Sequence, residues 1–153
     1  MPNRHIGILI KMASLAFDRT ASQLLLDHDL TPSQFKVLKY LSAHQDQLTR
    51  QIDLETFFKM SNPTVTVLLQ HLEKKDMIER RPHPTDKRCN IIILSEKARL
   101  KADDYLQKSK DIERQFTQVL SAEEQATLKQ LLLALIDSNP NTLHTKKGHH
   151  ADQ

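Results

Sequence analysis

Apolar residues are unusually dense at the start of the chain. Between residues 4 and 26 they recur on more than one side of a helical wheel, and neither proline nor, after Gly7, glycine interrupts them. A helix that is apolar on several sides must be buried by other elements. The pattern therefore predicts one long helix over residues 4–26, covered by a second chain or wrapped within its own fold.

Two shorter amphipathic helices are predicted next. Residues 31–34 (Thr-Pro-Ser-Gln) match a capping box with proline at the first helical position, and the helix that they open runs to about Ala43. Thr49 is the expected N-cap of a second helix that ends near residue 58. The residues of this helix that are expected to face the core are Leu54, Phe57 and Phe58.

A third helix follows a tight connector at residues 59–61 and fades at residues 75–76. A residue before proline is biased away from helical backbone angles, so Asn62 rather than Ser61 is the expected cap. The apolar side of this helix is made by Val65, Leu68, Leu69 and Leu72. The opposite side carries Pro63, Val67, Gln70 and Lys74, flanked by Thr64, Thr66 and His71.

After residue 76 the hydrophobic period shortens to that of strands. Residues 77–81 and 89–94 are β-type runs, and two prolines and an aspartate lie between them, which predicts a hairpin with a long exposed loop. Ser95 is then the expected cap of a long helix to about Leu120. Its inward positions are Ala98, Ala102, Tyr105, Ile112, Phe116 and Val119.

A last helix is predicted from a second capping box at residues 121–124 to a stop at residues 138–140. Its apolar residues are Leu128, Leu131, Leu132, Leu135 and Ile136. The tail, residues 139–153, is polar and is expected to be disordered. The whole order, with a helix, a short helix, a connector, a helix and a hairpin at its centre, predicts a mainly α (α+β) fold built around a winged helix-turn-helix.

The amino-acid composition argues against several other classes of protein. With only two glycines, neither a glycine-rich phosphate loop nor a turn-rich β-sandwich is expected. The single cysteine, Cys89, excludes an intramolecular disulfide and a cysteine-based zinc cluster. No apolar run is long enough for a membrane span and no cleavage-type signal is evident, so we expect a cytoplasmic protein with no membrane partner.

Positive charge gathers in the middle of the chain. The net charge is +3, whereas residues 59–101 carry ten Lys or Arg and five acidic residues, a net +5. This segment fits a surface that binds a polyanion, although a solvated charged face explains the charge alone equally well. The outward side of the third helix adds residues that read the major groove, because Gln pairs with adenine, Thr bonds to base edges or phosphates and Val contacts the thymine methyl.

Four stretches of the sequence resemble the MarR family of bacterial transcriptional regulators. They are residues 60–66 (Met-Ser-Asn-Pro-Thr-Val-Thr), 72–80 (Leu-Glu-Lys-Lys-Asp-Met-Ile-Glu-Arg), 82–88 (Pro-His-Pro-Thr-Asp-Lys-Arg) and 94–98 (Leu-Ser-Glu-Lys-Ala). The resemblance extends over about residues 5–138 and implies an obligate homodimer whose first and last helices intertwine. It divides the chain into a dimerisation helix (1–30), a DNA-binding domain (31–95), further dimerisation helices (96–138) and the tail. The sequence departs from the family at Lys59, where glycine is frequent, at Glu55, where a small residue is frequent, and at Val67, where arginine is common.

The resemblance also implies a function, that of a repressor-type transcriptional regulator that binds double-stranded DNA at a pseudo-palindromic operator and is released by a small-molecule effector. In the wing, Arg88 would enter the minor groove and Asp86 would brace the basic side chains. The expected DNA contacts are Ser61, Asn62, Thr64, Thr66, Val67, Gln70, His71, Lys74, Arg80, Lys87 and Arg88. A small aromatic or drug-like effector would bind a crevice lined by Met12, Leu15, Ala16, Phe35, Lys39 and Tyr40, unless these residues simply fill the core and leave Lys39 at the surface.

Two alternatives remain open, a metal- or redox-sensing regulator on the same scaffold and a winged-helix module for protein contacts. The histidines (His28, His44, His71, His83, His144, His149 and His150) match no metal-site spacing, so neither a metal nor another cofactor is expected. Cys89 fits better as a small strand residue than as a redox sensor. No nucleophile elbow, Cys-His pair or inward carboxylate pair is evident, so we do not expect an enzyme.

Overall fold

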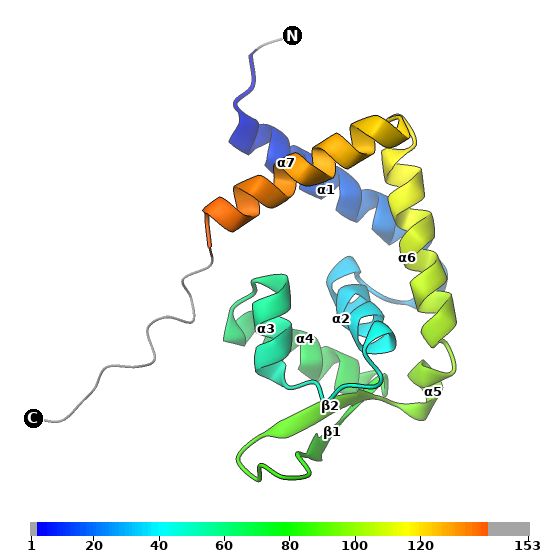
Figure 1. Ribbon diagram of the computed structural model, residues 1–153. Coiled ribbons are helices and arrows are strands. Elements are labelled where there is room, and N and C mark those ends of the chain that lie inside the picture. The colour runs from blue at the N-terminus through cyan, green and yellow to red at the C-terminus, as the bar shows by residue number, and fades with distance from the viewer. Residues whose placement is uncertain (1–2, 141–153) are drawn as a thin grey trace, which may run out of the picture. The chain divides into compact units, whose positions relative to one another are not determined.

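The structure is a computed structural model that describes residues 3–140. The elements of this part of the chain are α1 (Ile6–Leu24), the 3-10 turn η1 (Leu26–His28), α2 (Pro32–Ala43), α3 (Gln51–Phe58), α4 (Asn62–Lys74), β1 (Ile78–Pro82), β2 (Asn90–Leu94), α5 (Glu96–Arg99), α6 (Ala102–Thr117) and α7 (Ala122–Ser138) (Figure 1). The order helix, helix, helix and two-stranded hairpin confirms the mainly α fold with a winged helix-turn-helix. No helix among residues 3–140 is long and apolar enough to cross a membrane.

The chain forms two compact units that divide between Phe116 and Thr117. In the first unit, the centre of the core is made by leucines of α2, α3 and α4, with Leu38, Leu54, Leu69 and Leu72 fully buried. The same core includes residues from segments before residue 31 and after residue 95, among them Leu25 and Tyr105. The helices on either side of the predicted DNA-binding domain therefore hold it in place by direct packing.

The two strands form an antiparallel hairpin in which Ile78 pairs with Leu94 and Pro82 with Asn90. Ile78, Ile92 and Leu94 are buried, so one face of the hairpin belongs to the core. The other end of the hairpin runs out into the loop of residues 83–89, which together with the strands forms the wing (Figure 1).

Side-chain caps set the starts of α2, α4, α5 and α7, and the predicted cap of α4 was wrong by one residue. At α2 the predicted capping box is confirmed, since Thr31 Oγ1 accepts the Gln34 N–H at 3.2 Å and Gln34 Oε1 accepts the Thr31 N–H at 3.3 Å. At α4 the cap is Ser61 rather than Asn62, because Ser61 Oγ accepts the Thr64 N–H while Asn62 is already helical.

The short helix α3 also differs from its prediction. It is capped at Arg50, whose N–H donates to the Asp53 carboxylate at 2.8 Å, and not at Thr49. Thr49 is instead buried, with its carbonyl accepting the Ile92 N–H of β2. Phe57 was predicted to face the core but is 61% exposed. Leu54, by contrast, is fully buried in the core, as predicted.

The predicted long helix after Ser95 is two helices. Ser95 caps α5 as expected, but the Lys101 N–H bonds to the Ala98 carbonyl, three residues back, and this tight turn separates α5 from α6. The turn keeps both Ala98 and Ala102 in the core. α6 ends at Thr117, so Val119, which was expected to be inward, lies in the following turn and is 85% exposed.

The second unit begins with a capping box that matches its prediction. Ser121 Oγ accepts the Glu124 N–H at 3.1 Å, and Glu124 Oε1 accepts the Ser121 N–H at 2.9 Å. The helix it opens, α7, ends at Ser138, as the sequence predicts. The predicted disordered tail from residue 141 on, with His144, His149 and His150, lies outside the described residues.

Candidate nucleic-acid interface

The outer face of α4 is polar and free of core contacts. Burial follows the predicted wheel, with Val65, Leu69 and Leu72 buried and Leu68 packed against the core. The outward residues that are exposed are Pro63, Thr64, Val67, Gln70, His71 and Lys74. Together they form a strip along one side of a 13-residue helix, which is the form of an element that enters a DNA major groove.

Three residues of the predicted contact set are bonded to side chains of a neighbouring element. Thr66 Oγ1 accepts a hydrogen bond from Gln51 Nε2 at 2.8 Å. Asn62 Nδ2 donates to Glu55 Oε2 at 3.0 Å. These two bonds join α3 to the start of α4, so both side chains fix the angle between the helices.

Arg80, on β1, is the third of these residues. Its guanidinium Nε bonds to Glu73 Oε1 on α4, and its side chain is 29% exposed. The pair ties the hairpin to the end of α4. The partners Gln51, Glu55 and Glu73 could not be predicted from the sequence. Each lies seven or fifteen residues from the residue that it bonds, in a different element.

The loop of the wing carries an exposed arginine, Arg88, whose guanidinium is bonded to one aspartate, Asp86. Asp86 Oδ1 accepts both the backbone N–H and the Nε–H of Arg88 at 3.1 Å. The Arg88 side chain is nevertheless 91% exposed. Bonding from Arg88 is the main reason that the pKa of Asp86 lies below its usual value. The carboxylate thus stays charged and limits the directions in which the guanidinium can point.

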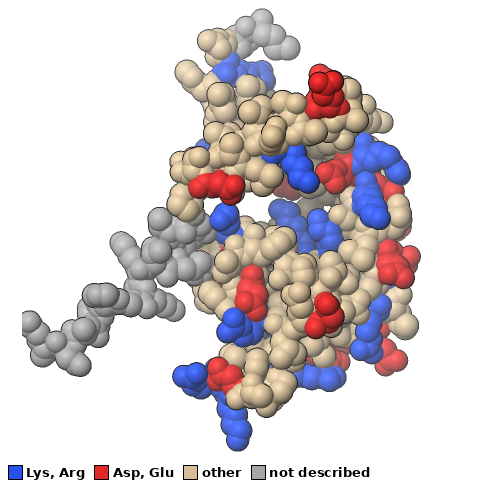
Figure 2. Space-filling model, in the orientation of Figure 1, with Lys and Arg blue, Asp and Glu red and all other residues tan. Residues whose placement is uncertain are grey.

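Lys and Arg side chains project at the lower end of the view in Figure 2, where the wing lies in Figure 1, with acidic side chains among them. Lys87 and Arg88 are both exposed there. The positive charge is therefore carried by separate projecting side chains rather than by a continuous basic sheet. Such an arrangement fits contacts to individual phosphates and to a narrow groove.

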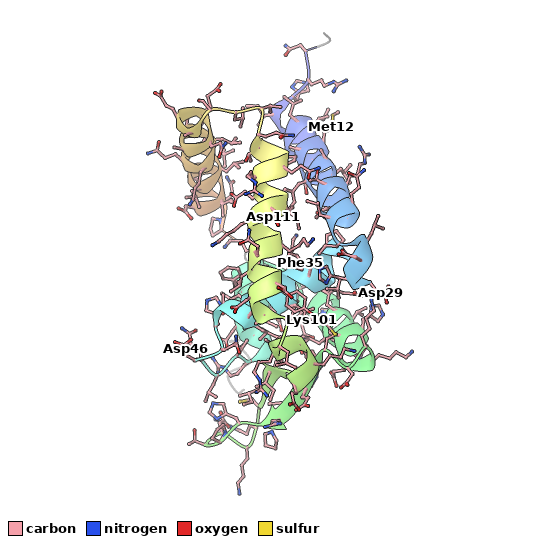
Figure 3. The ribbon with its side chains drawn as sticks, turned by 90° about the vertical axis from the view of Figure 1, so that its right-hand side faces the viewer. Met12, Asp29, Phe35, Asp46, Lys101 and Asp111 are labelled. Atoms are coloured by element: carbon pink, nitrogen blue, oxygen red, sulfur yellow. The ribbon has the colours of Figure 1, made fainter. Side chains whose placement is uncertain are left out.

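The predicted effector residues do not all come together. Met12 and Leu15 are exposed, and Met12 lies well up α1, away from Phe35 on α2 (Figure 3). Tyr40 is turned away from the others, because its ring stacks on His44 with 4.1 Å between centroids and contacts Phe57 edge-on at 4.8 Å. Ala16 is partly buried on α1.

Phe35 and Lys39 do share a cavity between α1, α2 and α6. It has a volume of about 50 Å³, and its other lining residues are Phe17, Ala21, Pro32, Lys36, Ser109 and Ile112. Burial lowers the pKa of Lys39, and the negative charge of Glu113 opposes this effect. The cavity is far smaller than the roughly 300–1,000 Å³ of ordinary small-molecule sites.

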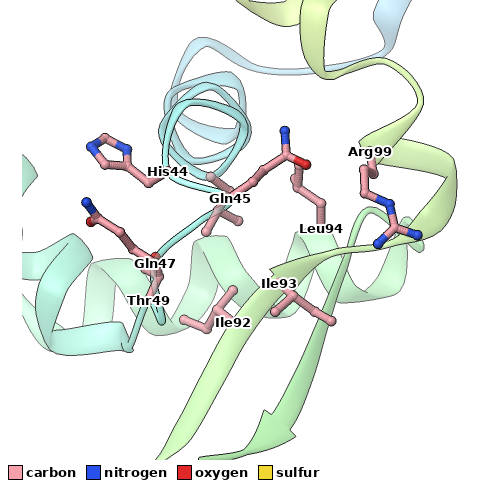
Figure 4. Close-up of a pocket in the computed structure, with 9 residues that line it drawn as sticks. His44, Gln45, Gln47, Thr49, Ile92, Ile93, Leu94 and Arg99 are labelled. Carbon is pink, nitrogen blue, oxygen red and sulfur yellow. The ribbon is translucent and has the colours of Figure 1, made fainter.

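Two further hollows flank the segment that joins α2 to α3. One, of about 140 Å³, lies between the end of α2 and β2, with His44, Gln45 and Arg99 at its rim (Figure 4). The other is an open groove of about 610 Å³ between α3 and the wing. Its lining includes Tyr40, Arg50, Asp53, Phe57 and His83.

Residues that could bind a metal are scattered. Among residues 3–140, no three His, Cys, Asp or Glu side chains lie close enough together to hold a metal ion. Cys89 was expected to be a small strand residue, but it lies in the bend just before β2, where it is partly buried with its Sγ 3.7 Å from the Asp86 carbonyl oxygen.

Comparisons with known proteins agree with this geometry. The sequence profile of the MarR family matches residues 30–90. The multiple antibiotic resistance protein MarR of Salmonella typhimurium is 30% identical over 132 residues, which cover 86% of this chain and 90% of that protein. Among solved structures, the Staphylococcus aureus MepR–DNA complex has a TM-score of 0.80 at 29% identity and covers 89% of this chain and 99% of its own. A mutant Escherichia coli MarR complexed with operator DNA has a TM-score of 0.77 at 29% identity and covers 86% of this chain and 93% of its own.

Proposed function

The chain belongs to the MarR family of DNA-binding transcriptional regulators, and we propose that it acts as a homodimeric repressor that places α4 in the major groove and the wing in the flanking minor groove of its operator. The observation that carries the proposal is the exposed polar strip on α4 beside an exposed arginine held by Asp86. The relatives solved with DNA support this assignment. With DNA as its partner, the protein acts in the cytoplasm and performs no catalytic step.

Within this interface the residues divide by role. Gln70 and Thr64 are the exposed side chains of α4 that read base edges, and Val67 lies between them for contact with a thymine methyl. Lys74 and Lys87 are exposed cations for phosphates. Thr66, Asn62 and Arg80 act through the bonds to Gln51, Glu55 and Glu73, and so position α4 rather than read sequence.

Dimer formation is supported by apolar surface at both ends of the sequence. In α1 the side chains of Ile6, Ile8 and Leu15 are at least half exposed. In α7 the exposed apolar residues are Leu128, Leu131, Leu132, Leu133, Leu135 and Ile136. Monomeric proteins rarely expose apolar patches of this extent, so a second copy of the chain is the natural partner for these helices.

The test of this function is a mobility-shift titration with DNA from the protein's own promoter region and with a scrambled sequence of equal length. We expect tighter binding to the promoter DNA and a steep loss of affinity with added salt. Lys74→Ala should weaken binding to both DNAs alike and lower the slope of log affinity against log salt concentration by about one. Gln70→Ala should reduce the difference in affinity between promoter and scrambled DNA. Equal affinity for both DNAs would rule out an operator-binding role.

For an effector, the cavity of Phe35 and Lys39 is the site that we propose. Lys39 offers a partly buried cation beside the aromatic ring of Phe35, which suits an aromatic acid. Because the cavity is only about 50 Å³, a ligand of this kind must widen it by moving α1 or α6 away from α2. Binding would then favour a different arrangement of the DNA-binding helices from the one that fits the operator.

Titration of the operator complex with aromatic acids and cationic drugs tests this site. Lys39→Ala should abolish release by an aromatic acid, whereas Tyr40→Phe, the matched control, should leave it intact because Tyr40 stacks on His44 outside the cavity. If the DNA is still released after Lys39→Ala, or if no compound releases it at millimolar concentration, this cavity is not the effector site.

A further inference from the structure

The loop of the wing is folded around one imidazole ring. Nδ1 of His83 accepts the backbone N–H of Thr85 at 3.2 Å and that of Asp86 at 3.0 Å. The Thr85 hydroxyl lies 3.4 Å from the same nitrogen. The backbone N–H of His83 donates to the Cys89 carbonyl at 3.1 Å and closes the base of the loop. A single side chain therefore sets the path of the residues that lead to Arg88.

Both backbone bonds require a lone pair on Nδ1. In a neutral imidazole one ring nitrogen accepts and the other carries the proton, so an accepting Nδ1 places the proton on Nε2. A second proton would occupy Nδ1 and turn it into a donor that faces two other donors. The observed fold of the loop is compatible only with neutral His83.

The bonds to His83 also restrict the position of Arg88. The Asp86 N–H is bonded to His83, and the Asp86 carboxylate accepts from both the N–H and the Nε–H of Arg88. We propose that His83 positions Asp86 and Arg88 for the minor groove, and that protonation of His83 in mild acid releases the loop and weakens DNA binding. The inference rests on the role of the wing in the proposed function.

Charged groups face His83 from two sides. Within the loop, the partly exposed Asp86 carboxylate interacts with the His83 imidazole. Across the groove, Arg50 and Asp53 of α3 face the same space but are paired with each other at 3.3 Å, so their charges largely offset. Solvent screens the attraction of Asp86. The loss of two hydrogen bonds at Nδ1 then determines the behaviour of the loop.

Protonation of His83 would change the affinity for DNA in two ways that have opposite signs, which makes the proposal testable. Added positive charge near phosphates would strengthen binding in acid, as it does for histidines in general. Release of the loop would weaken it. Both effects depend on the proton of the same ring, so a comparison of neutral with mildly acidic solution shows which one prevails.

The experiment compares the full chain with His83→Asn and His83→Ala by fluorescence anisotropy on operator DNA at fixed ionic strength. Asn supplies an oxygen that accepts N–H groups two or three residues ahead and does not titrate, whereas Ala supplies no acceptor. On going from about pH 7.5 to 5.5 we expect the wild type to lose about fivefold affinity relative to His83→Asn, for two hydrogen bonds lost. His83→Ala should be weak at both pH values. The other seven histidines are common to all three proteins, so the ratio isolates His83. A constant ratio, or a gain by the wild type in acid, would overturn the proposal.

A second measurement needs no DNA. Nitrogen-15 NMR of the imidazoles in the free protein should show the Nε2–H tautomer for His83 at neutral pH, and the amide signals of Thr85 and Asp86 should move as His83 titrates. A Nδ1–H tautomer would overturn the proposal whatever the DNA result. If the NMR signals behave as expected but no variant prefers operator over scrambled DNA, it is the DNA-binding function that fails, and with it the proposed effect on affinity.

Discussion

Asn62 Nδ2 donates a hydrogen bond to Glu55 Oε2 at 3.0 Å, and the Glu55 residue is only 3% exposed. This glutamate is a buried residue of α3, and the asparagine at the first helical position of α4 supplies it with a donor. The bond crosses the turn between α3 and α4, so it holds the two helices of the helix-turn-helix at their angle. The side chain that the sequence assigned to DNA is used here to accommodate a buried carboxylate.

Replacement of Asn62 by Ala should lower the free energy of unfolding by about 1–3 kcal/mol, because a buried charged acceptor loses a donor. Urea unfolding followed by circular dichroism measures the change. A double-mutant cycle with Glu55→Gln separates this bond from the other effects of each substitution. Additive effects, with a coupling below about 0.5 kcal/mol, would show that the bond contributes nothing to stability.

Lys59 adopts left-handed backbone angles, with φ at 53°, at the end of α3. A Cβ in that conformation costs about 1–2 kcal/mol, and glycine avoids the cost while losing about 0.5–1 kcal/mol through its freer unfolded chain. Lys59→Gly should therefore stabilise the protein by about 0.5–1 kcal/mol. Lys59→Ala is the control, since it removes the charge and keeps the Cβ. A Lys59→Gly protein that is less stable than Lys59→Ala by about 0.5–1 kcal/mol would mean that the backbone angle carries no strain.

Local signals in the sequence were sufficient for the parts of the fold that local chemistry determines. The capping boxes at Thr31 and Ser121 involve residues three apart, and both formed as predicted. The apolar stripe of α4 was also read correctly, because one helix has one period. The exposed strip of α4, which we propose faces the DNA, lies on the opposite side of the same helix.

Features set by tertiary packing were not accessible in this way. The turn between α5 and α6 contains neither glycine nor proline, and it forms because Ala98 and Ala102 both pack into the core. Tyr40 does not join the predicted effector residues, because its ring stacks on His44 and contacts Phe57 edge-on. These contacts join the end of α2 to α3. The acceptor role of His83 had a possible signal, a polar side chain just before Pro84 in a turn, but histidine is not among the usual residues there.

The pKa of Glu124 is lowered, first by the backbone N–H of Ser121 and then by the Ser121 side chain. A carboxyl whose pKa is lower in the folded state adds stability above its unfolded-state pKa and loses it as the pH falls through the folded value. Glu124→Gln should thus be less stable than the wild type at neutral pH, and the difference should close in acid. Urea midpoints measured from pH 7 down to about pH 3 follow the change, on the usual scale of glutamate titration. A difference that persists unchanged in acid would exclude a role for the charge.

Leu131 of α7 is 60% exposed within one chain and belongs to the apolar surface assigned to dimerisation. Leu131→Lys should shift the protein toward monomer and weaken operator binding, because burying an unpaired ammonium in an apolar interface is costly. Sedimentation velocity measures the association state. Leu100→Lys is the matched control, since Leu100 is 81% exposed at the turn between α5 and α6. A Leu131→Lys protein that remains a dimer at micromolar concentration would place the interface elsewhere.

Arg88→Ala tests the wing directly. The side chain is 91% exposed and its guanidinium bonds to Asp86 of the same loop, so its removal should leave the melting temperature nearly unchanged. Loss of a specific groove contact should weaken operator binding by about 1–3 kcal/mol. Arg114→Ala is the matched control, because Arg114 is also exposed and paired with an aspartate, Asp111 at 2.8 Å, but lies on α6. Anisotropy titrations of both variants at one salt concentration give the comparison. If Arg88→Ala and Arg114→Ala bind the operator equally well, the arginine of the wing makes no contact that matters and specificity must come from α4 alone.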